Sequence, residues 1–191
     1  MYDAVEDPYC YTGTTVLKNI PRIRDQATLD KFEAVSTAQR SDEPLPKGRL
    51  SIVHYRAIHH HLFRDVYSWA GKFRTVRISK DGSAFCYPEN IAREMKGLFA
   101  DLKRRRYLQG LSRDEFATQA AHFLATLNAI HPFREGNGRT QTSFLALLAD
   151  QAGHPVALER INPETFLAVI IASFHGNEGP LAEELRRLVA P

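Results

Sequence analysis

The chain has 191 residues, of which 43% are hydrophobic and 25% charged, and its formal net charge is +3 at pH 7. These values predict one globular, soluble domain, residues 1–191, that is large enough for a real core. No apolar run reaches 18 residues and the N-terminus does not resemble a secretory signal, so we expect no membrane partner. The mild positive charge does not predict direct binding of nucleic acid. Cys10 and Cys86 lack metal-ligand spacing, and we interpret them as free thiols in a reducing compartment.

The first half of the chain predicts an irregular arm, two helices and a β-hairpin. Residues 1–24, interrupted by proline and glycine, look like an arm laid over the domain. Asp25 is a suitable N-cap for a helix to about residue 41, and apolar residues at helical spacing predict a second helix over about 51–67. The period then changes, and over about 73–87 two β-prone runs flank an Asp-Gly turn, which is typical of hairpins.

The second half predicts further helices, each with a recognisable end. Pro88 opens one that the basic run 103–106 closes, where the cations complement the helix dipole. Ser112 and Glu115 form a capping box for the next. A largely apolar and buried helix follows over 139–152, and two more run from about 162 to 176 and from about 180 to 189. The predicted fold class is all-α, a helical bundle with a small β-hairpin on its surface.

Residues 131–139 read His-Pro-Phe-Arg-Glu-Gly-Asn-Gly-Arg and stand between two predicted helices; we call them the motif loop. The glycines flanking Asn137 permit positive φ and close approach of a ligand to the backbone. They lie at the start of a helix, whose N–H groups and dipole favour an anion. The guanidinium of Arg139 suits a phosphate. These features predict an anion site, although Gly-Asn-Gly taken alone would favour a glycine-rich turn between helices with a capping histidine.

Two further side chains in the motif loop suggest chemistry rather than binding alone. Glu135 is misplaced for direct contact with an anion, but its carboxylate suits a Mg²⁺ ion that bridges phosphate oxygens. His131 can act as a general base, since imidazoles titrate near neutral pH. Base, metal ligand and anion site within nine residues therefore indicate phosphoryl or nucleotidyl transfer.

At these residues the sequence resembles the Fic-domain family. The segment HPFREGNGRTQT is similar to the family signature H-x-F-x-[D/E]-G-N-G-R-x-x-R. The arm DPYCYTGTTVLKN, the segment LFRDVYSWAGKFR and the sequence GNEGPL also resemble the small Fic domains of bacterial toxin–antitoxin modules and translocated effectors. The resemblance spans nearly the whole chain, and it implies the Fic fold and a protein adenylyltransferase that uses ATP and Mg²⁺.

The resemblance also implies a role for individual positions. His131 would deprotonate a Ser, Thr or Tyr hydroxyl of a target protein, Phe133 would anchor the loop, and Glu135 would bind Mg²⁺. The motif region 131–142 and one later turn would supply the nucleotide-binding residues Arg134, Gly136, Asn137, Gly138, Arg139, Thr142 and Asn177. A helix C-terminal turn explains Asn177 nearly as well. The hairpin would be a flap that docks the target through Ser79, Lys80, Asp81, Gly82, Ser83, Ala84 and Phe85; the alternative is a plain surface ribbon.

One position departs from the signature. Its second arginine, which in relatives grips the γ-phosphate and pairs with an inhibitory glutamate, is Thr142 here. Three interpretations follow: weaker use of ATP with AMP transfer retained, which we favour; a different nucleotide donor; or an impaired enzyme. The rival hypothesis is a non-catalytic module that holds a nucleotide and a peptide.

The resemblance also implies partners and a location. No inhibitory motif [S/T]-x-x-x-E-[G/N] occurs in the chain, so an inhibitor would be a separate small antitoxin protein. The modified target would be a type II topoisomerase subunit or a GTPase. The location would be the bacterial cytoplasm, or a host cell after secretion.

The remaining histidines do not predict a metal site. His59, His60 and His61 are consecutive, and residues about 100° apart on a helix cannot all ligate one metal. We expect them and His54 on a solvated or half-buried helix surface. His122 could lie near the site or in the core, and we favour the core. We expect Tyr67 and Trp69 to pack beneath the hairpin.

Overall fold

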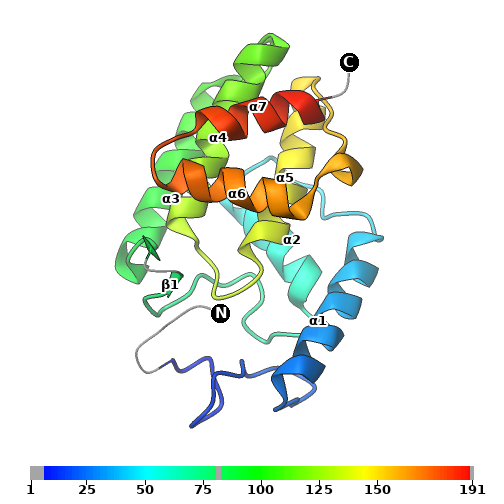
Figure 1. Cartoon of the computed structure of the whole chain (residues 1–191), viewed down its shortest axis with the longest axis vertical. Helices are drawn as coiled ribbons and strands as arrows, with labels where there is room; N and C mark the ends of the chain where they lie inside the picture. The colour runs from blue at the N-terminus through cyan, green and yellow to red at the C-terminus, as the bar shows by residue number, and fades with distance from the viewer. Residues whose placement is uncertain (1–6, 81–82, 190–191) are drawn as a thin grey trace. The chain divides into compact units, whose positions relative to one another are not determined.

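The computed structural model describes residues 7–80 and 83–189 and is mainly helical (Figure 1). This confirms the predicted fold class. The elements in chain order are α1 (Gln26–Ser41), α2 (Ile52–Phe63), β1 (Ser79–Lys80), β2 (Ser83–Ala84), α3 (Pro88–Arg104), the 3-10 turn η1 (Arg106–Leu108), α4 (Arg113–Ile130), α5 (Asn137–Ala152), the 3-10 turn η2 (Leu158–Arg160), α6 (Pro163–Phe174) and α7 (Gly179–Leu188). No helix among the described residues is both long enough and apolar enough to cross a membrane.

The chain forms two compact units. Unit 1 contains the described residues up to Ile91 together with Pro132–Thr140, and unit 2 contains Ala92–His131 and the described residues from Gln141 onward. Helices α3 and α5 therefore begin in unit 1 and continue in unit 2. The single domain that we expect over residues 1–191 stays a prediction.

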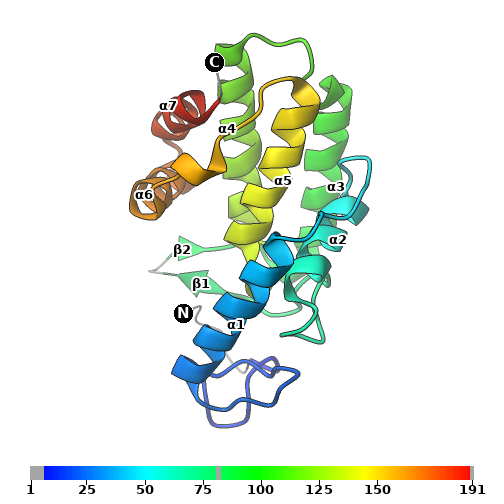
Figure 2. The same cartoon turned by 90° about the vertical axis from the view of Figure 1, so that its right-hand side faces the viewer.

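Unit 2 is a helical bundle around α4. Helices α6 and α7 pack against α4 and against each other, as the turned view in Figure 2 shows. Aromatic rings join the other helices: Phe99 of α3, Phe123 of α4 and Phe144 of α5 lie with their ring centroids 5.4–5.7 Å apart. The expected burial of α5 is confirmed for most of its apolar positions, since Phe144, Leu145 and Leu148 are fully buried.

The predicted helix starts are confirmed by their caps. The side chains of Asp25, Ser51 and Asn162 each accept a hydrogen bond from a backbone N–H in the first turn of α1, α2 and α6. Ser112 and Glu115 form the full reciprocal capping box at the start of α4. Each such cap contributes about 1 kcal/mol to helix stability.

Unit 1 is built on the pair α1 and α2, with irregular segments around them. The Nε of Arg40 donates to Asp65 at 2.6 Å, and His61 Nε2 lies 2.8 Å from the Arg40 carbonyl oxygen. The described part of the arm, residues 7–24, contains one isolated bridge, between Cys10 and Leu17. The N–H of Ile20 donates to the Val66 carbonyl and ties the arm to the segment after α2. Both cysteines are free thiols, as expected.

Helix α2 differs from the prediction in two ways. It ends at Phe63 rather than near residue 67. The predicted end was too late because the turns after the helix also bury Val66 and Tyr67, which continue the apolar pattern. The expectation of a solvated or half-buried position is wrong for three of the four histidines, since α2 buries most of its circumference. The buried ones, His54, His59 and His61, each place a ring nitrogen on a backbone carbonyl, and only His60 is exposed.

The hairpin is shorter than predicted. Its strands pair only Ser79 with Ala84 and Lys80 with Ser83, and the expected turn residues Asp81 and Gly82 lie outside the described residues. Strand pairing does not extend back to residue 73 because Arg74, which is buried, takes up the neighbouring carbonyls. Its guanidinium donates to the carbonyl oxygens of Val76 at 2.7 Å and Cys86 at 2.6 Å.

Candidate nucleotide-transfer site

The motif loop starts at the C-cap of α4. His131 has φ 48° and ψ 63°, a left-handed conformation, and its N–H donates to the Leu127 carbonyl. Its Nδ1 lies 3.2 Å from the carbonyl oxygen of Asn128, and the residue is 6% exposed. Because a carbonyl only accepts, Nδ1 carries the proton, and in the neutral ring Nε2 is then the basic nitrogen. The helix end thus sets the tautomer that a general base requires.

Phe133 anchors the next part of the loop in unit 1. The ring is completely buried and is surrounded by Tyr55, His59 and Phe73, with centroid distances of 5.5, 3.7 and 5.9 Å. Burying an aromatic ring of this size stabilises a fold by about 3 kcal/mol. Its burial agrees with the anchoring role that the resemblance implies.

His59 supports the loop from α2, and the sequence reasoning missed it. Its Nδ1 accepts a hydrogen bond from the Gly71 N–H at 2.8 Å, so Nε2 carries the proton and donates to the Glu135 carbonyl at 2.9 Å. Burial lowers the pKa of His59 to about 3 and keeps the ring neutral. Its spacing of four residues from both Tyr55 and Phe63 was the available signal that it lies on the buried face.

Asn137 and Gly136 fix the backbone of the loop. The Asn137 amide accepts from the Phe133 N–H at 2.9 Å and donates to the Phe133 carbonyl at 2.8 Å. Its side chain therefore braces the loop, whereas we predicted a phosphate contact. Gly136 has φ 80°, and a Cβ there would lie 2.2 Å from the Phe63 ring, so only glycine fits.

Gly138 needs a different explanation. It lies in the first turn of α5, is exposed, and a Cβ built on it would meet nothing within 4 Å. Glycine in a helix costs about 1 kcal/mol relative to alanine. Since the described residues give no steric reason for glycine at this position, the absence of a side chain is consistent with close approach of a ligand.

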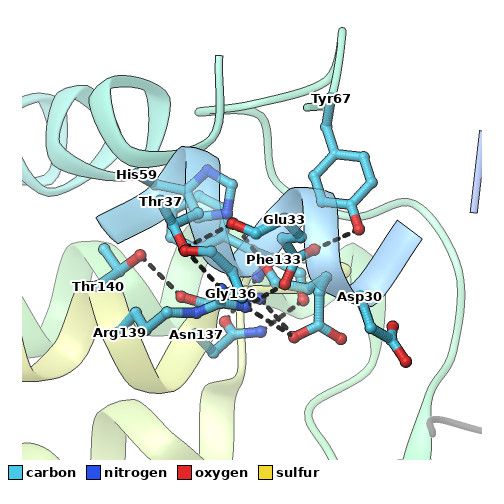
Figure 3. A network of polar contacts seen from close by, with 12 residues as sticks. Asp30, Glu33, Thr37, His59, Tyr67, Phe133, Gly136, Asn137, Arg139 and Thr140 are labelled. Carbon is cyan, nitrogen blue, oxygen red and sulfur yellow. Dashed lines mark hydrogen bonds and ion pairs between the residues drawn. The ribbon is translucent and has the colours of Figure 1, made fainter. Parts of the chain in front are cut away.

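The Arg139 side chain is held by α1 and α2 (Figure 3). Its Nη2 pairs with the Glu33 carboxylate and its Nη1 donates to Thr37 Oγ1 at 3.2 Å. The guanidinium carbon lies 4.6 Å from the centroid of the Phe63 ring, a cation–π distance. With 41% of its side chain exposed, Arg139 is anchored and accessible at once.

Glu135 is half-buried and lies near a second negative charge. Its Oε1 accepts from the Gly136 N–H at 2.8 Å and lies 3.8 Å from Arg139 Nη2. Burial, and secondarily the charge of Glu33, raise the pKa of Glu135, while the Gly136 hydrogen bond opposes the shift. A divalent cation bound here would offset both the loss of hydration and the repulsion by Glu33. Among the described residues no group of three or more His, Cys, Asp or Glu forms a cation site, so bound phosphates would have to supply further ligands.

Arg134 does not lie where we predicted. We expected it to bind the nucleotide, but its side chain is 4% exposed and its Nε donates to Asp7 at 2.7 Å. A buried guanidinium paired with a buried carboxylate fastens the N-terminal arm to the loop. We therefore reassign Arg134 to structural support.

The other predicted positions lie outside the braced part of the loop. Thr142 is half-buried in α5, and Asn177 is exposed in the turn between α6 and α7; both belong to unit 2. In the flap, Ser79, Lys80, Ser83 and Ala84 form the paired strands and Phe85 follows them. Their roles stay predictions. The placement of His122 in the core is wrong: its side chain is 58% exposed and lies 3.1 Å from Glu178, so its charged partner keeps it at the surface.

Replacement of Gly136 should test the packing of the loop. We expect Gly136→Ala to lower the free energy of unfolding by about 2–5 kcal/mol, because it combines an unfavourable positive φ with overlap against Phe63. Gly153→Ala is the matched control, since Gly153 has φ 83° but a Cβ placed there would meet nothing within 4 Å. Urea unfolding measures both; equal losses would show that the Phe63 contact is unimportant.

The buried, neutral His59 should make stability depend on pH. Its pKa of about 3 in the folded protein lies below the ordinary value of 6.5, so the unfolded chain binds the extra proton and unfolding becomes easier as pH falls below about 6.5. Between pH 7 and pH 5 this residue should account for about 2 kcal/mol of lost stability. Urea unfolding at both pH values should show that His59→Gln removes this part, whereas His60→Gln, at the exposed neighbour, keeps it. The same pH dependence in wild type and His59→Gln would contradict the assignment.

Comparison with known proteins identifies relatives over most of the chain. Residues 49–149 match the model of the Fic/DOC family. The chain is 50% identical over 189 residues to the probable protein adenylyltransferase y4lH of Sinorhizobium fredii, covering 98% of each chain. It is 35% identical over 164 residues to the probable protein adenylyltransferase Fic of Escherichia coli, covering 84% of this chain and 80% of that one.

The chain is also similar to solved structures of Fic-domain proteins. The BepC effector of Bartonella tribocorum with bound AMPPNP superimposes with a TM-score of 0.86 at 30% identity, covering 96% of each chain. The N-terminal Fic domain of a cell filamentation protein of Bartonella quintana with bound ADP also gives 0.86, at 32% identity, covering 96% of this chain and 94% of that one. With its motif loop, its fold and these relatives in agreement, the chain belongs to the Fic/DOC family.

Proposed function

We propose that this protein is a protein adenylyltransferase, which transfers AMP from ATP to a Ser, Thr or Tyr hydroxyl of another protein. The observation that carries the proposal is the braced motif loop. One segment joins a histidine whose Nδ1 is held by a carbonyl to an exposed helical glycine and an anchored arginine. Relatives named as probable adenylyltransferases, and relatives with bound AMPPNP or ADP, support the same activity.

His131 would act as the general base. The target hydroxyl oxygen attacks the α-phosphorus while its proton passes to Nε2 of His131. The bond between the α-phosphorus and the oxygen bridging to the β-phosphate breaks, and pyrophosphate leaves. A new phosphodiester then joins AMP to the target side chain.

The start of α5 would hold the phosphates of the donor. Backbone N–H groups of a first helical turn point toward an anion, and the dipole favours its charge. Gly138 would let the phosphates approach the backbone, and Arg139 would contact the β-phosphate. We assign no phosphate contact to the Arg134 side chain, because its guanidinium is buried against Asp7.

Glu135 is the residue that would hold Mg²⁺. A hard carboxylate oxygen beside a second carboxylate, Glu33, and next to the proposed phosphate site fits the preference of this ion for oxygen ligands. When bound, Mg²⁺ would neutralise charge on the phosphate oxygens.

Thr142 bears on the choice of donor. A threonine hydroxyl is shorter than an arginine side chain and uncharged, so a γ-phosphate would lose a charge-assisted hydrogen bond there. Such a bond contributes about 1.5–3 kcal/mol, which corresponds to a roughly ten- to hundredfold weaker affinity. We therefore favour retained transfer of AMP with weaker binding of ATP over a different donor or a non-catalytic module.

The partners proposed for this chain follow from the same activity. The target would dock on the flap, and the small antitoxin would bind in trans because the chain lacks the inhibitory motif. A type II topoisomerase subunit and a GTPase are the two target classes. We propose the bacterial cytoplasm, or a host cell after secretion, as the place of action.

Removal of the proposed base should separate catalysis from binding. We expect His131→Ala to reduce transfer of α-labelled AMP from ATP onto lysate proteins by at least about a hundredfold. Calorimetric binding of AMPPNP should change little, because the imidazole acts on the hydroxyl rather than on the phosphates. His60→Ala, at an exposed histidine of α2, is the control. Undiminished labelling by His131→Ala would rule out the assigned base.

Gly138 offers a test with opposite effects on stability and binding. We expect Gly138→Ala to raise the free energy of unfolding by up to about 1 kcal/mol, since alanine favours helix and its Cβ has room. The same methyl group would occupy the space of the phosphates, so the Kd for AMPPNP should rise at least about tenfold. Unchanged affinity would mean that the phosphates lie elsewhere.

A further inference from the structure

Glu33 of α1 connects two polar groups that lie far from it in sequence. One carboxylate oxygen accepts a hydrogen bond from the Tyr67 hydroxyl and the other pairs with Nη2 of Arg139 (Figure 3). Its side chain is only 14% exposed. The carboxylate is therefore occupied on both oxygens and largely withdrawn from water.

Thr37, one turn later on α1, completes the support of Arg139. Its hydroxyl donates to the Glu33 backbone carbonyl at 2.8 Å, so the oxygen is left to accept from Arg139 Nη1 at 3.2 Å. The ring of Phe63 contacts the face of the guanidinium. Two hydrogen-bonded edges and one stacked face together select a single orientation of a long side chain.

Stability alone does not account for this arrangement. Arg139 is 41% exposed, and ion pairs with a partner that exposed contribute only about 0–1 kcal/mol to folding. Holding an arginine in one rotamer also costs entropy. A ligand that later binds the arginine does not have to meet this entropic cost, because the side chain is already held in one orientation.

We propose that Glu33 is a positioning residue, which aligns Arg139 for the β-phosphate of the nucleotide before the nucleotide binds. The inference rests on the proposed function, since it takes Arg139 as a phosphate ligand. Glu33 does not touch the nucleotide; Tyr67 fixes the carboxylate, and the carboxylate together with Thr37 fixes the guanidinium.

The opposite role, a carboxylate that blocks Arg139 and must move away for ATP to bind, fits the contacts less well. Tyr67 is 2% exposed and its hydroxyl donates to Glu33. Withdrawal of Glu33 would leave that hydroxyl buried without this partner, at a cost typical of an unsatisfied polar group. Burial, and secondarily the charge of Glu33, raise the pKa of Tyr67, so the hydroxyl stays protonated and remains a donor.

The test compares two nucleotides that differ by one phosphate. Calorimetry with Mg²⁺ should show that Glu33→Gln weakens ADP about tenfold and changes the affinity for AMP, which lacks the β-phosphate, less than twofold. A purely structural defect would weaken both nucleotides alike. Thermal unfolding of each variant checks that the fold is kept.

Two variants serve as controls. Asp30→Asn removes a carboxylate from the same helix; Asp30 is exposed, accepts from Gln26 rather than from Arg139, and should bind ADP like wild type. In an Arg139→Ala background, Glu33→Gln should cause no further loss of ADP affinity, because the group that it positions is gone.

The outcomes separate the inference from the proposed function. Tighter ADP binding by Glu33→Gln would identify a blocking carboxylate and overturn the inference, as would unchanged binding or an equal loss for AMP. A wild-type protein that binds neither nucleotide would overturn the proposed function itself, and the inference with it.

Discussion

The stacking of Phe133 on His59 is the contact on which the motif loop depends. The loop has no regular secondary structure between α4 and α5, so its shape must come from side chains. Phe133 anchors it in the core of unit 1, and His59 then holds the Glu135 carbonyl. The Asn137 amide closes the same stretch onto Phe133. Because the side chains of Phe133, His59 and Asn137 are buried, the proposed phosphate site would need little reorganisation when a ligand arrives.

Much of the fold and of the loop could be predicted from the sequence, because the signals were local. Caps such as Ser112 with Glu115, and the spacing of apolar residues, depend on neighbours within one or two turns. The contacts that the sequence did not reveal join distant positions. Glu33 is 106 residues from Arg139, and Asp7 is 127 residues from Arg134. No periodicity relates such pairs, so Arg134 was predicted to bind the nucleotide when it is a buried support.

Negative charges outnumber positive charges around Arg139, and this affects how the proposed site would bind a nucleotide. Two carboxylates, Glu33 and Glu135, lie close to one guanidinium, that of Arg139. In the proposed reaction, an incoming triphosphate would add further negative charge. A cation at Glu135 would restore the balance, and the replacement of the signature's second arginine by Thr142 makes that compensation more important here.

The left-handed conformation of His131 has a consequence for how this helix end is built. At such a position glycine costs least, since any Cβ crowds the following carbonyl oxygen, and asparagine is the residue with a side chain that tolerates it best. In the proposed mechanism, helix α4 therefore ends on the residue that acts as the base and not on the residue that adopts this conformation most easily. The protein accepts a less stable helix terminus in exchange for an imidazole whose direction is fixed by the backbone itself.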